Sequence, residues 1–394
     1  MRLKYLNLKY ALVNIGYMLL ISGSLGFAYN YLSQSGFDDG TAGTTMSLVS
    51  LFGALLGPVA ADVVDRSSKV TQKMFITASM FVCAAFSAIL LLIPSGSFLI
   101  LPVVVISFMC STIGMPLLNG MAFIYKRFGG VIDYGLCRGL GSAAFALGSF
   151  FIGKIWAGIG RNTLPIWVMV AALLTLLAVQ LMPNPPRGDA DDELSQKGES
   201  ISILQFFGRY KNVAVVALSL VLMFFCNFII LNYMAKVIGA FETSDVEGVQ
   251  GMAFLIQAMV EVPAMLGFSR LMRRFEIRTI LVAASVLYSI KHIVVLMCNS
   301  VPVLYAAMVL QMVSYAPLIP ATVYFSDESV AEADQNKGQA VFATASTVGS
   351  LLASFVGGWL FLFFDVRLVL TVGVVSSVLG TILMALGVRL DSNA

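Results

Sequence analysis

The chain has 394 residues, of which 59% are hydrophobic and only 11% are charged. A typical soluble protein carries about 25% charged residues, so this chain has too few to cover a water-exposed surface. The composition excludes a soluble enzyme. It also excludes a disordered chain, which needs low hydrophobicity and high charge. The net charge of +3 is too small to indicate nucleic-acid binding. The chain is therefore expected to be an all-α integral membrane protein.

Apolar stretches long enough to cross a bilayer recur along the whole chain. A membrane-spanning helix needs about 20 mostly apolar residues, and the sequence predicts twelve such helices. They cover residues 10–32, 42–64, 74–93, 98–125, 134–157, 164–182, 213–237, 249–271, 279–298, 303–325, 338–362 and 368–388. The only long polar segment separates the sixth helix from the seventh. The predicted organisation is a six-helix bundle over 1–182, a cytoplasmic linker over 183–212 and a second six-helix bundle over 213–394.

The positions of Lys and Arg predict the orientation, because cytoplasmic loops carry an excess of both. If the N-terminus is inside, most of the 24 Lys and Arg residues fall in cytoplasmic loops. The predicted outer loops hold only Lys154, Arg161, Lys236 and Arg367. Both termini are therefore predicted to be cytoplasmic, in the cell (inner) membrane. No small-residue cleavage site follows the first apolar run, so it is expected to be a retained helix.

The cysteine and histidine content argues against a metal site and against a catalytic site. The five cysteines all lie in apolar stretches without Cys-x-x-Cys spacing, which favours small buried core residues. A single histidine in the whole chain makes a histidine-based metal site or catalytic triad improbable. We expect no metal, no cofactor and no catalytic residues, so the chain is not predicted to be an enzyme.

Few ionisable residues lie inside the predicted helices. Inserting each one into the membrane costs at least about 2.5–3.5 kcal/mol on insertion scales, so its presence indicates a structural or functional role. Glu261 lies midway along the eighth helix, where a carboxylate must be protonated or paired. It is a candidate proton carrier and acceptor for solute hydroxyls; the alternative is a structural ion pair. Arg138 lies about one turn inside the fifth helix and suits two hydroxyls or one carboxylate. The alternative for Arg138 is a side chain that extends to the interface.

Lys291 and His292 are adjacent in the ninth helix, so they point about 100° apart and are not expected to face the same cavity. One of them could pair with Glu261, and both are candidates for proton coupling. The blander alternative for His292 is a buried histidine that is hydrogen-bonded within the bundle. Polar residues that could line a solute cavity are Asn119, Asn227, Gln257 and Gln311, although such side chains also bond between helices.

Small residues in two helices predict close helix packing rather than ligand contact. They are Gly53 and Gly57 in the second helix, and Gly139, Gly141 and Gly148 in the fifth.

Three stretches resemble the major facilitator superfamily, in particular the oligosaccharide:proton symporter branch that includes lactose permease. Asp65-Arg66-x-x-Lys69 resembles the D-[RK]-x-x-[RK] core of the loop signature between the second and third helices. Residues 134–147, with Arg138, resemble the fifth helix of that branch, and residues 247–261 resemble its eighth. The resemblance implies a twelve-helix fold of two six-helix bundles. It implies gating for Asp65, Arg66 and Lys69 and sugar binding for Arg138 and Glu261.

The chain departs from that branch at several places. Ala61 and Ser68 replace two glycines of the loop signature. The acidic partner expected in the fourth helix falls near Asn119-Gly120, where there is no acid. The His and Glu that the resemblance would place in the tenth helix fall in residues 310–316, which contain neither. Either Glu261 itself takes the proton, or the protein is a facilitator or uses another ion.

Together these features favour a secondary active transporter that imports a small hydroxylated solute, such as a sugar or oligosaccharide, by proton symport and alternating access. The partners are then the solute, a proton and the lipid bilayer, with no nucleic acid, and the chain is expected to act as a monomer. Alternatives are a proton-coupled exporter of amphipathic compounds, favoured by the 20 Met and 28 Phe, a nucleoside importer, and a receptor or membrane enzyme.

Overall fold

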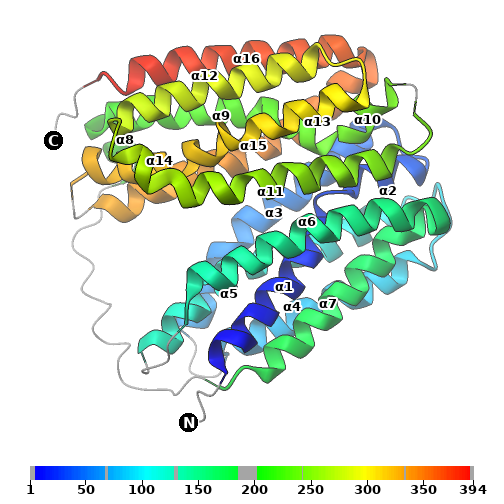
Figure 1. Ribbon diagram of the computed structural model, residues 1–394. Helices are drawn as coiled ribbons and strands as arrows, with labels where there is room; N and C mark the ends of the chain where they lie inside the picture. The colour runs from blue at the N-terminus through cyan, green and yellow to red at the C-terminus, as the bar shows by residue number, and fades with distance from the viewer. Residues whose placement is uncertain are drawn as a thin grey trace. The chain divides into compact units, whose positions relative to one another are not determined.

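The computed structural model describes residues 5–66, 70–127, 132–184, 202–241, 243–331 and 334–390, and in these ranges every regular element is a helix (Figure 1). The first part of the chain forms α1 (Leu6–Ser24), α2 (Ala28–Gln34), α3 (Asp39–Arg66), α4 (Gln72–Leu90), α5 (Ile100–Arg127), α6 (Tyr134–Ile159) and α7 (Thr163–Leu181). The second part forms α8 (Ile203–Arg209), α9 (Lys211–Asn232), α10 (Met234–Gly239), α11 (Val246–Met272), α12 (Ile277–Leu296), α13 (Val301–Val309), α14 (Tyr315–Ser329), α15 (Gln335–Phe363) and α16 (Val366–Gly387). Short 3₁₀ helices cover Gly160–Asn162 and Leu310–Met312.

The helices confirm the predicted all-helical membrane fold. Within the described ranges, 11 apolar segments are long enough to cross a bilayer, and one of them, Tyr134–Leu181, holds both α6 and α7. Each of the twelve predicted spans coincides with one of these helices or helix pairs to within a few residues. The orientation of the termini stays a prediction.

Three predicted spans are interrupted, which the apolar pattern did not reveal. The first span breaks between α1 and α2, and the seventh breaks at Tyr233 between α9 and α10. The tenth breaks between α13 and α14, where the 3₁₀ helix Leu310–Met312 intervenes. Hydropathy reports only that a segment is apolar, so it does not distinguish a continuous helix from two shorter ones.

The predicted linker contains a helix, α8. Ser202 begins it with a capping box: the Gln205 backbone N–H donates to Ser202 Oγ (3.3 Å), and the Ser202 N–H donates to Gln205 Oε1 (2.9 Å). Phe206 is fully buried and packs on the Tyr210 ring, with centroids 4.9 Å apart. Phe206 thus gives this part of the linker an apolar side, which the sequence analysis did not predict. Residues 185–201 of the linker lie outside the described residues.

The chain divides into two compact units. Unit 1 comprises residues 1–186, 232–258 and 354–363, and unit 2 comprises residues 187–231, 259–353 and 364–394. Unit 1 therefore includes α10, the first half of α11 and the end of α15, which come from the second half of the chain. The predicted domain boundary at 183–212 stays a prediction.

In unit 1, α1 packs against α6 and α7, and glycines set how closely the helices approach (Figure 1). A Cβ on Gly16 would lie 3.1 Å from the Thr175 backbone of α7, and a Cβ on Gly148 would lie 2.7 Å from Ser22 Oγ of α1. Gly141 faces α1 in the same way, as predicted. The prediction of close packing is wrong for Gly139, because no atom lies within 4 Å of a Cβ built there: Gly139 is on another face of α6.

Of the two glycines in the second predicted helix, Gly53 packs closely as predicted, whereas Gly57 makes only an ordinary van der Waals contact. A Cβ on Gly53 would overlap Thr112 of α5, and one on Gly57 would lie 3.8 Å from Pro116 of the same helix. Both small residues therefore face the α3–α5 contact within unit 1.

The substitution Gly16→Ala tests this packing. The added methyl group would push against α7 backbone, which cannot rotate away, so we expect a loss of about 1–3 kcal/mol in the free energy of unfolding. Gly158→Ala in α6 is the control, because its Cβ meets nothing within 4 Å. That variant should be neutral or up to about 1 kcal/mol more stable. Unfolding of the purified protein in detergent measures both, and equal effects would contradict the packing argument.

Candidate functional site

The two adjacent polar residues of α12 point to different neighbours, as predicted. Lys291 is fully buried, and its Nζ donates to Asn227 Oδ1 on α9 (3.2 Å) and to Gln311 Oε1 (2.5 Å). His292 is also fully buried, and its Nδ1 lies 2.8 Å from Ser377 Oγ on α16. His292 therefore joins two packed helices, whereas Lys291 faces a set of polar acceptors. The predicted part of Lys291 and His292 in proton coupling stays a prediction.

Gln311 lies in the break of the tenth span, which places its amide between two charged side chains. The helical path changes at Ser314 (φ −109°, ψ −86°), before α14 begins at Tyr315. Pro317 and Pro320 follow in the first turns of α14, and proline cannot donate the backbone hydrogen bond that would continue a helix. Gln311 Nε2 donates to Glu261 Oε1 on α11 (2.9 Å). Irregular backbone at membrane depth is tolerated only where other groups satisfy it.

Glu261, Gln311, Lys291 and Asn227 thus form one hydrogen-bonded chain inside unit 2, hereafter the Lys291 network. The Lys291 ammonium donates to two amide oxygens, and the Gln311 amide N–H₂ donates to the Glu261 carboxylate. In the described part of the chain, no carboxylate lies within 4 Å of Lys291 Nζ, so the acid and the base interact through the Gln311 amide. Sequence reasoning paired them directly and missed this bridge.

The ring of Tyr288 completes the surroundings of the Lys291 ammonium, with its centroid 5.5 Å from Nζ. An aromatic face attracts a cation, and the attraction is stronger away from water. Glu261 is only half-buried, in contrast to Lys291, and no hydrogen bond from the described residues reaches its Oε2. One oxygen of this carboxylate thus keeps its acceptor capacity while the other is held by Gln311.

Arg138 lies in unit 1, one turn after α6 begins at Tyr134. Its Nη1 makes a long contact to Met18 Sδ (3.5 Å), a weak acceptor. The Arg138 side chain is half-buried. Among the described residues, its guanidinium group donates to no oxygen acceptor. Its predicted part in sugar binding stays a prediction.

Two further predicted site residues in unit 1 carry buried amide oxygens that have no hydrogen-bond partner among the described residues. These are Asn119 Oδ1 on α5 and Gln257 Oε1 on α11. Buried polar atoms without partners are rare in proteins, which keeps both amides as candidates for solute contact. The side chains of Asp65 and Arg66, at the end of α3, and all of Lys69 lie outside the described residues.

A polar cluster in unit 1 escaped the sequence analysis. The Asp39 carboxylate at the start of α3 forms an ion pair with Lys236 of α10 and accepts a hydrogen bond from Tyr29 Oη of α2 (2.6 Å). We call Tyr29, Asp39, Tyr233 and Lys236 the Asp39 cluster; the Tyr29 and Tyr233 rings lie 5.0 Å apart. The sequence does contain the two opposite charges, Asp39 in the first half and Lys236 in the second. Their pairing depends on the fold, so no local pattern predicts it.

Further contacts in unit 1 extend the Asp39 cluster between α2 and α11. Asn30 Nδ2 donates to Gln250 Oε1 (3.0 Å), and Gln34 Nε2 donates to Glu247 Oε1 (2.8 Å). Close backbone contact accompanies them, since a Cβ on Gly43 would lie 2.8 Å from Gly358 Cα. Segments from the two halves of the sequence are therefore joined here by polar bonds and by glycine packing.

Comparisons with known proteins agree with the helical arrangement. The sequence matches the family described as MFS_1 like over residues 8–372. A mutant of the nucleoside transporter NupG has a similar structure, with a TM-score of 0.82 and 14% identity over 97% of this chain and 99% of that chain. A bacterial homolog of the human lysosomal transporter Spinster, in an inward-facing and unoccupied conformation, is also similar. Its TM-score is 0.72, and its identity is 15% over 98% of this chain and 97% of that chain.

A bacterial homologue of the iron transporter ferroportin, in an inward-facing state, has a TM-score of 0.70 and 13% identity over 98% of both chains. No curated protein matches the sequence. At these identities the structural likeness shows the fold alone.

The substitution Gln311→Leu tests whether the amide bridge supports the charges. It removes an acceptor from Lys291 and a donor from Glu261, and a buried group left without its partner costs about 1–3 kcal/mol, or more when charged. We expect a loss of that size in the free energy of unfolding. Gln257→Leu is the matched control, since the Gln257 amide oxygen has no partner to lose; it should be neutral within about 0.5 kcal/mol. Equal losses in both variants would count against the bridge.

Proposed function

The chain belongs to the MFS_1 like family, and we propose that it imports a small hydroxylated solute together with a proton. Family membership makes it a secondary transporter of the major facilitator type, an integral membrane protein that moves a small molecule and is not an enzyme. The observation that carries the finer proposal is the Lys291 network, in which an acid and a base share one amide within a membrane span.

Proton coupling needs an acid whose protonation changes its bonds. The ionised Glu261 carboxylate accepts a charge-assisted hydrogen bond from Gln311, and such bonds are roughly twice as strong as neutral ones. Protonation removes the negative charge, weakens that bond and leaves the Lys291 ammonium without a counter-charge across the amide. The network then favours a different arrangement, which links proton binding to conformational change.

Solute binding draws on the acceptor that the network leaves open. Glu261 Oε2 can accept a solute hydroxyl, while the part of Arg138 in solute binding stays a prediction. Sugars and oligosaccharides present several hydroxyls and are the first solute class to test. Nucleosides are the second, because a nucleoside transporter shares this fold and a ribose also presents hydroxyls.

Alternating access requires contacts that break when the pathway opens. The Asp39 cluster joins the two halves of the sequence through an ion pair and side-chain hydrogen bonds, which exchange with water at little cost. It lies at the ends of helices that the Lys and Arg distribution places outside the cell. In this proposal it is the outer gate.

Glu261→Gln tests the coupling. Glutamine has the same shape but does not take up a proton, so we expect pH-driven accumulation of labelled sugars or nucleosides in vesicles to fall to the equilibrium ratio. Exchange of solute across equal concentrations should persist, because it needs no net proton movement. Glu328→Gln, which changes an exposed acid at the end of α14, should leave accumulation intact. Uphill uptake that survives in the Glu261 variant would refute the coupling.

A thiol cross-link tests the gate. Gln34→Cys combined with Glu247→Cys, in a background without the native cysteines, replaces a hydrogen-bonded pair at the surface of unit 1. A short cleavable cross-linker should stop uptake, and reduction should restore it. Each single cysteine variant treated with the same reagent is the control and should remain active. Undiminished uptake after complete cross-linking would rule out this end as a gate.

A further inference from the structure

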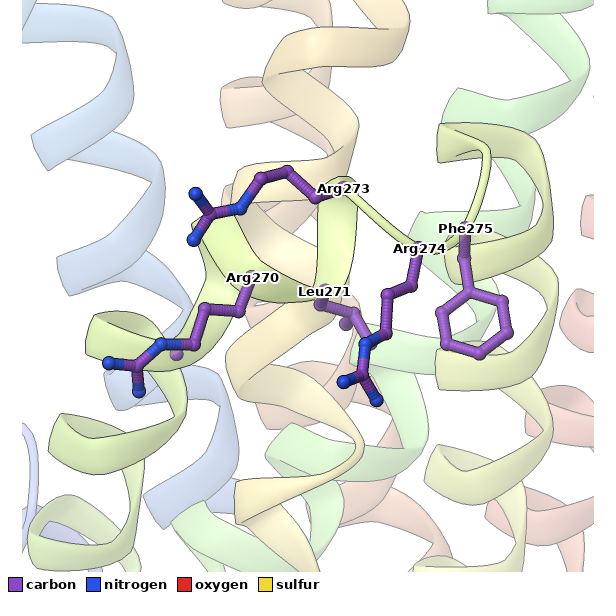
Figure 2. A pocket seen from close by; sticks show the side chains of 6 residues that line it. Arg270, Leu271, Arg273, Arg274 and Phe275 are labelled. Carbon is purple, nitrogen blue, oxygen red and sulfur yellow. The ribbon is translucent and has the colours of Figure 1, made fainter.

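A pocket of about 560 Å³ lies at the end of α11 in unit 2, away from the Lys291 network (Figure 2). Its lining comes from the last turns of α11 and the turn that leads into α12. The lining residues are Gly267, Arg270, Leu271, Arg273, Arg274 and Phe275. Figure 2 shows the three arginine side chains around Leu271, with the ring of Phe275 beside them. The pocket thus combines three guanidinium groups with two apolar side chains.

The three arginines of the pocket have no counter-ion among the described residues, unlike Arg209 and Lys337 of the same unit. In the described part of the chain, no carboxylate lies within 4 Å of Arg270, Arg273 or Arg274, and all three are exposed. By contrast, Arg209 and Lys337 share the Asp334 carboxylate, each at 3.9 Å. A planar guanidinium matches phosphate oxygens in a bidentate fork. Three unpaired guanidinium groups around one pocket therefore favour a phosphate-bearing anion.

The surroundings favour a phosphate that is attached to an apolar body. Leu266, one turn before the arginines, is 79% exposed, and Phe275 is 52% exposed. Both adjoin the end of Val246–Met272, an apolar segment long enough to span the bilayer. Exposed apolar side chains on such a segment face acyl chains, and arginines at its end lie at the depth of the headgroups.

We propose that this pocket binds the headgroup phosphate of an anionic phospholipid. The Lys and Arg distribution places this end of α11 on the cytoplasmic side, where the leaflet is negatively charged and each nearby basic residue contributes about 1 kcal/mol of attraction. The guanidinium groups bind the phosphate, and the acyl chains lie along Leu266 and Phe275. Gly267 leaves room for the headgroup, since a Cβ built there meets no atom within 4 Å.

The test measures binding of phosphatidylglycerol to the purified full-length chain in detergent, from the concentration that half-saturates its thermal stabilisation. Phosphatidylcholine and inorganic phosphate are the comparison ligands. Arg270→Gln, Arg273→Gln and Arg274→Gln combined should raise the half-saturating concentration at least tenfold. The matched control removes the same charge from exposed positions outside the pocket, with Arg278→Gln, Lys211→Gln and Arg389→Gln, and should change it less than threefold.

A second variant separates the pocket from the charge. Gly267→Phe keeps all three arginines but occupies the space beside them, and it should weaken phosphatidylglycerol binding at least fivefold. Equal weakening by the two triple variants would overturn the proposal, because it would mean non-specific attraction to a basic surface. Stabilisation by inorganic phosphate with no further gain from phosphatidylglycerol would also overturn it, in favour of a soluble phosphate ligand.

Discussion

The ammonium group of Lys291 is the constraint around which unit 2 is arranged. A charge on a fully buried side chain in a membrane span is tolerated only if other groups replace water around it. Asn227 and Gln311 supply the oxygens and Tyr288 supplies a ring face. Because Gln311 occupies the break between α13 and α14, the interrupted helix is part of how the charge is accommodated. The break in the helix and the stabilisation of the Lys291 charge therefore depend on each other.

The same arrangement explains how a single proton could affect a large part of the protein. Glu261 on α11, Gln311 in the broken span, Lys291 on α12 and Asn227 on α9 lie on four separate elements. A change in the charge of Glu261 alters the bond to Gln311, and through that amide it alters the environment of Lys291. Helices that share a hydrogen-bonded network respond together when one member changes. The Asp39 cluster in unit 1 offers weak polar contacts of the kind that can separate in response.

Much of the fold could be predicted because apolar length and loop charge are properties of single segments. Apolar length and helical geometry predict the twelve spans, the close packing at Gly141 and Gly148, and the divergence of Lys291 from His292. The Gln311 bridge could not be predicted, because it depends on the break after α13 and on which helices are neighbours. The Asp39–Lys236 ion pair joins residues far apart in sequence, so no local pattern contains it. The helix α8 was missed because a short apolar pair in a polar segment is a weak signal.

The central claim is that Glu261 and Lys291 depend on each other through the Gln311 amide. A double-mutant cycle with Glu261→Gln and Lys291→Met, read from the free energies of unfolding in mixed micelles, tests it most directly. The account predicts that each single variant leaves one charge without its counter-charge across the amide, and that the double variant recovers stability, with an interaction energy of about 0.5–3 kcal/mol. Strictly additive losses would contradict it, because they would mean that the acid and the base are energetically independent.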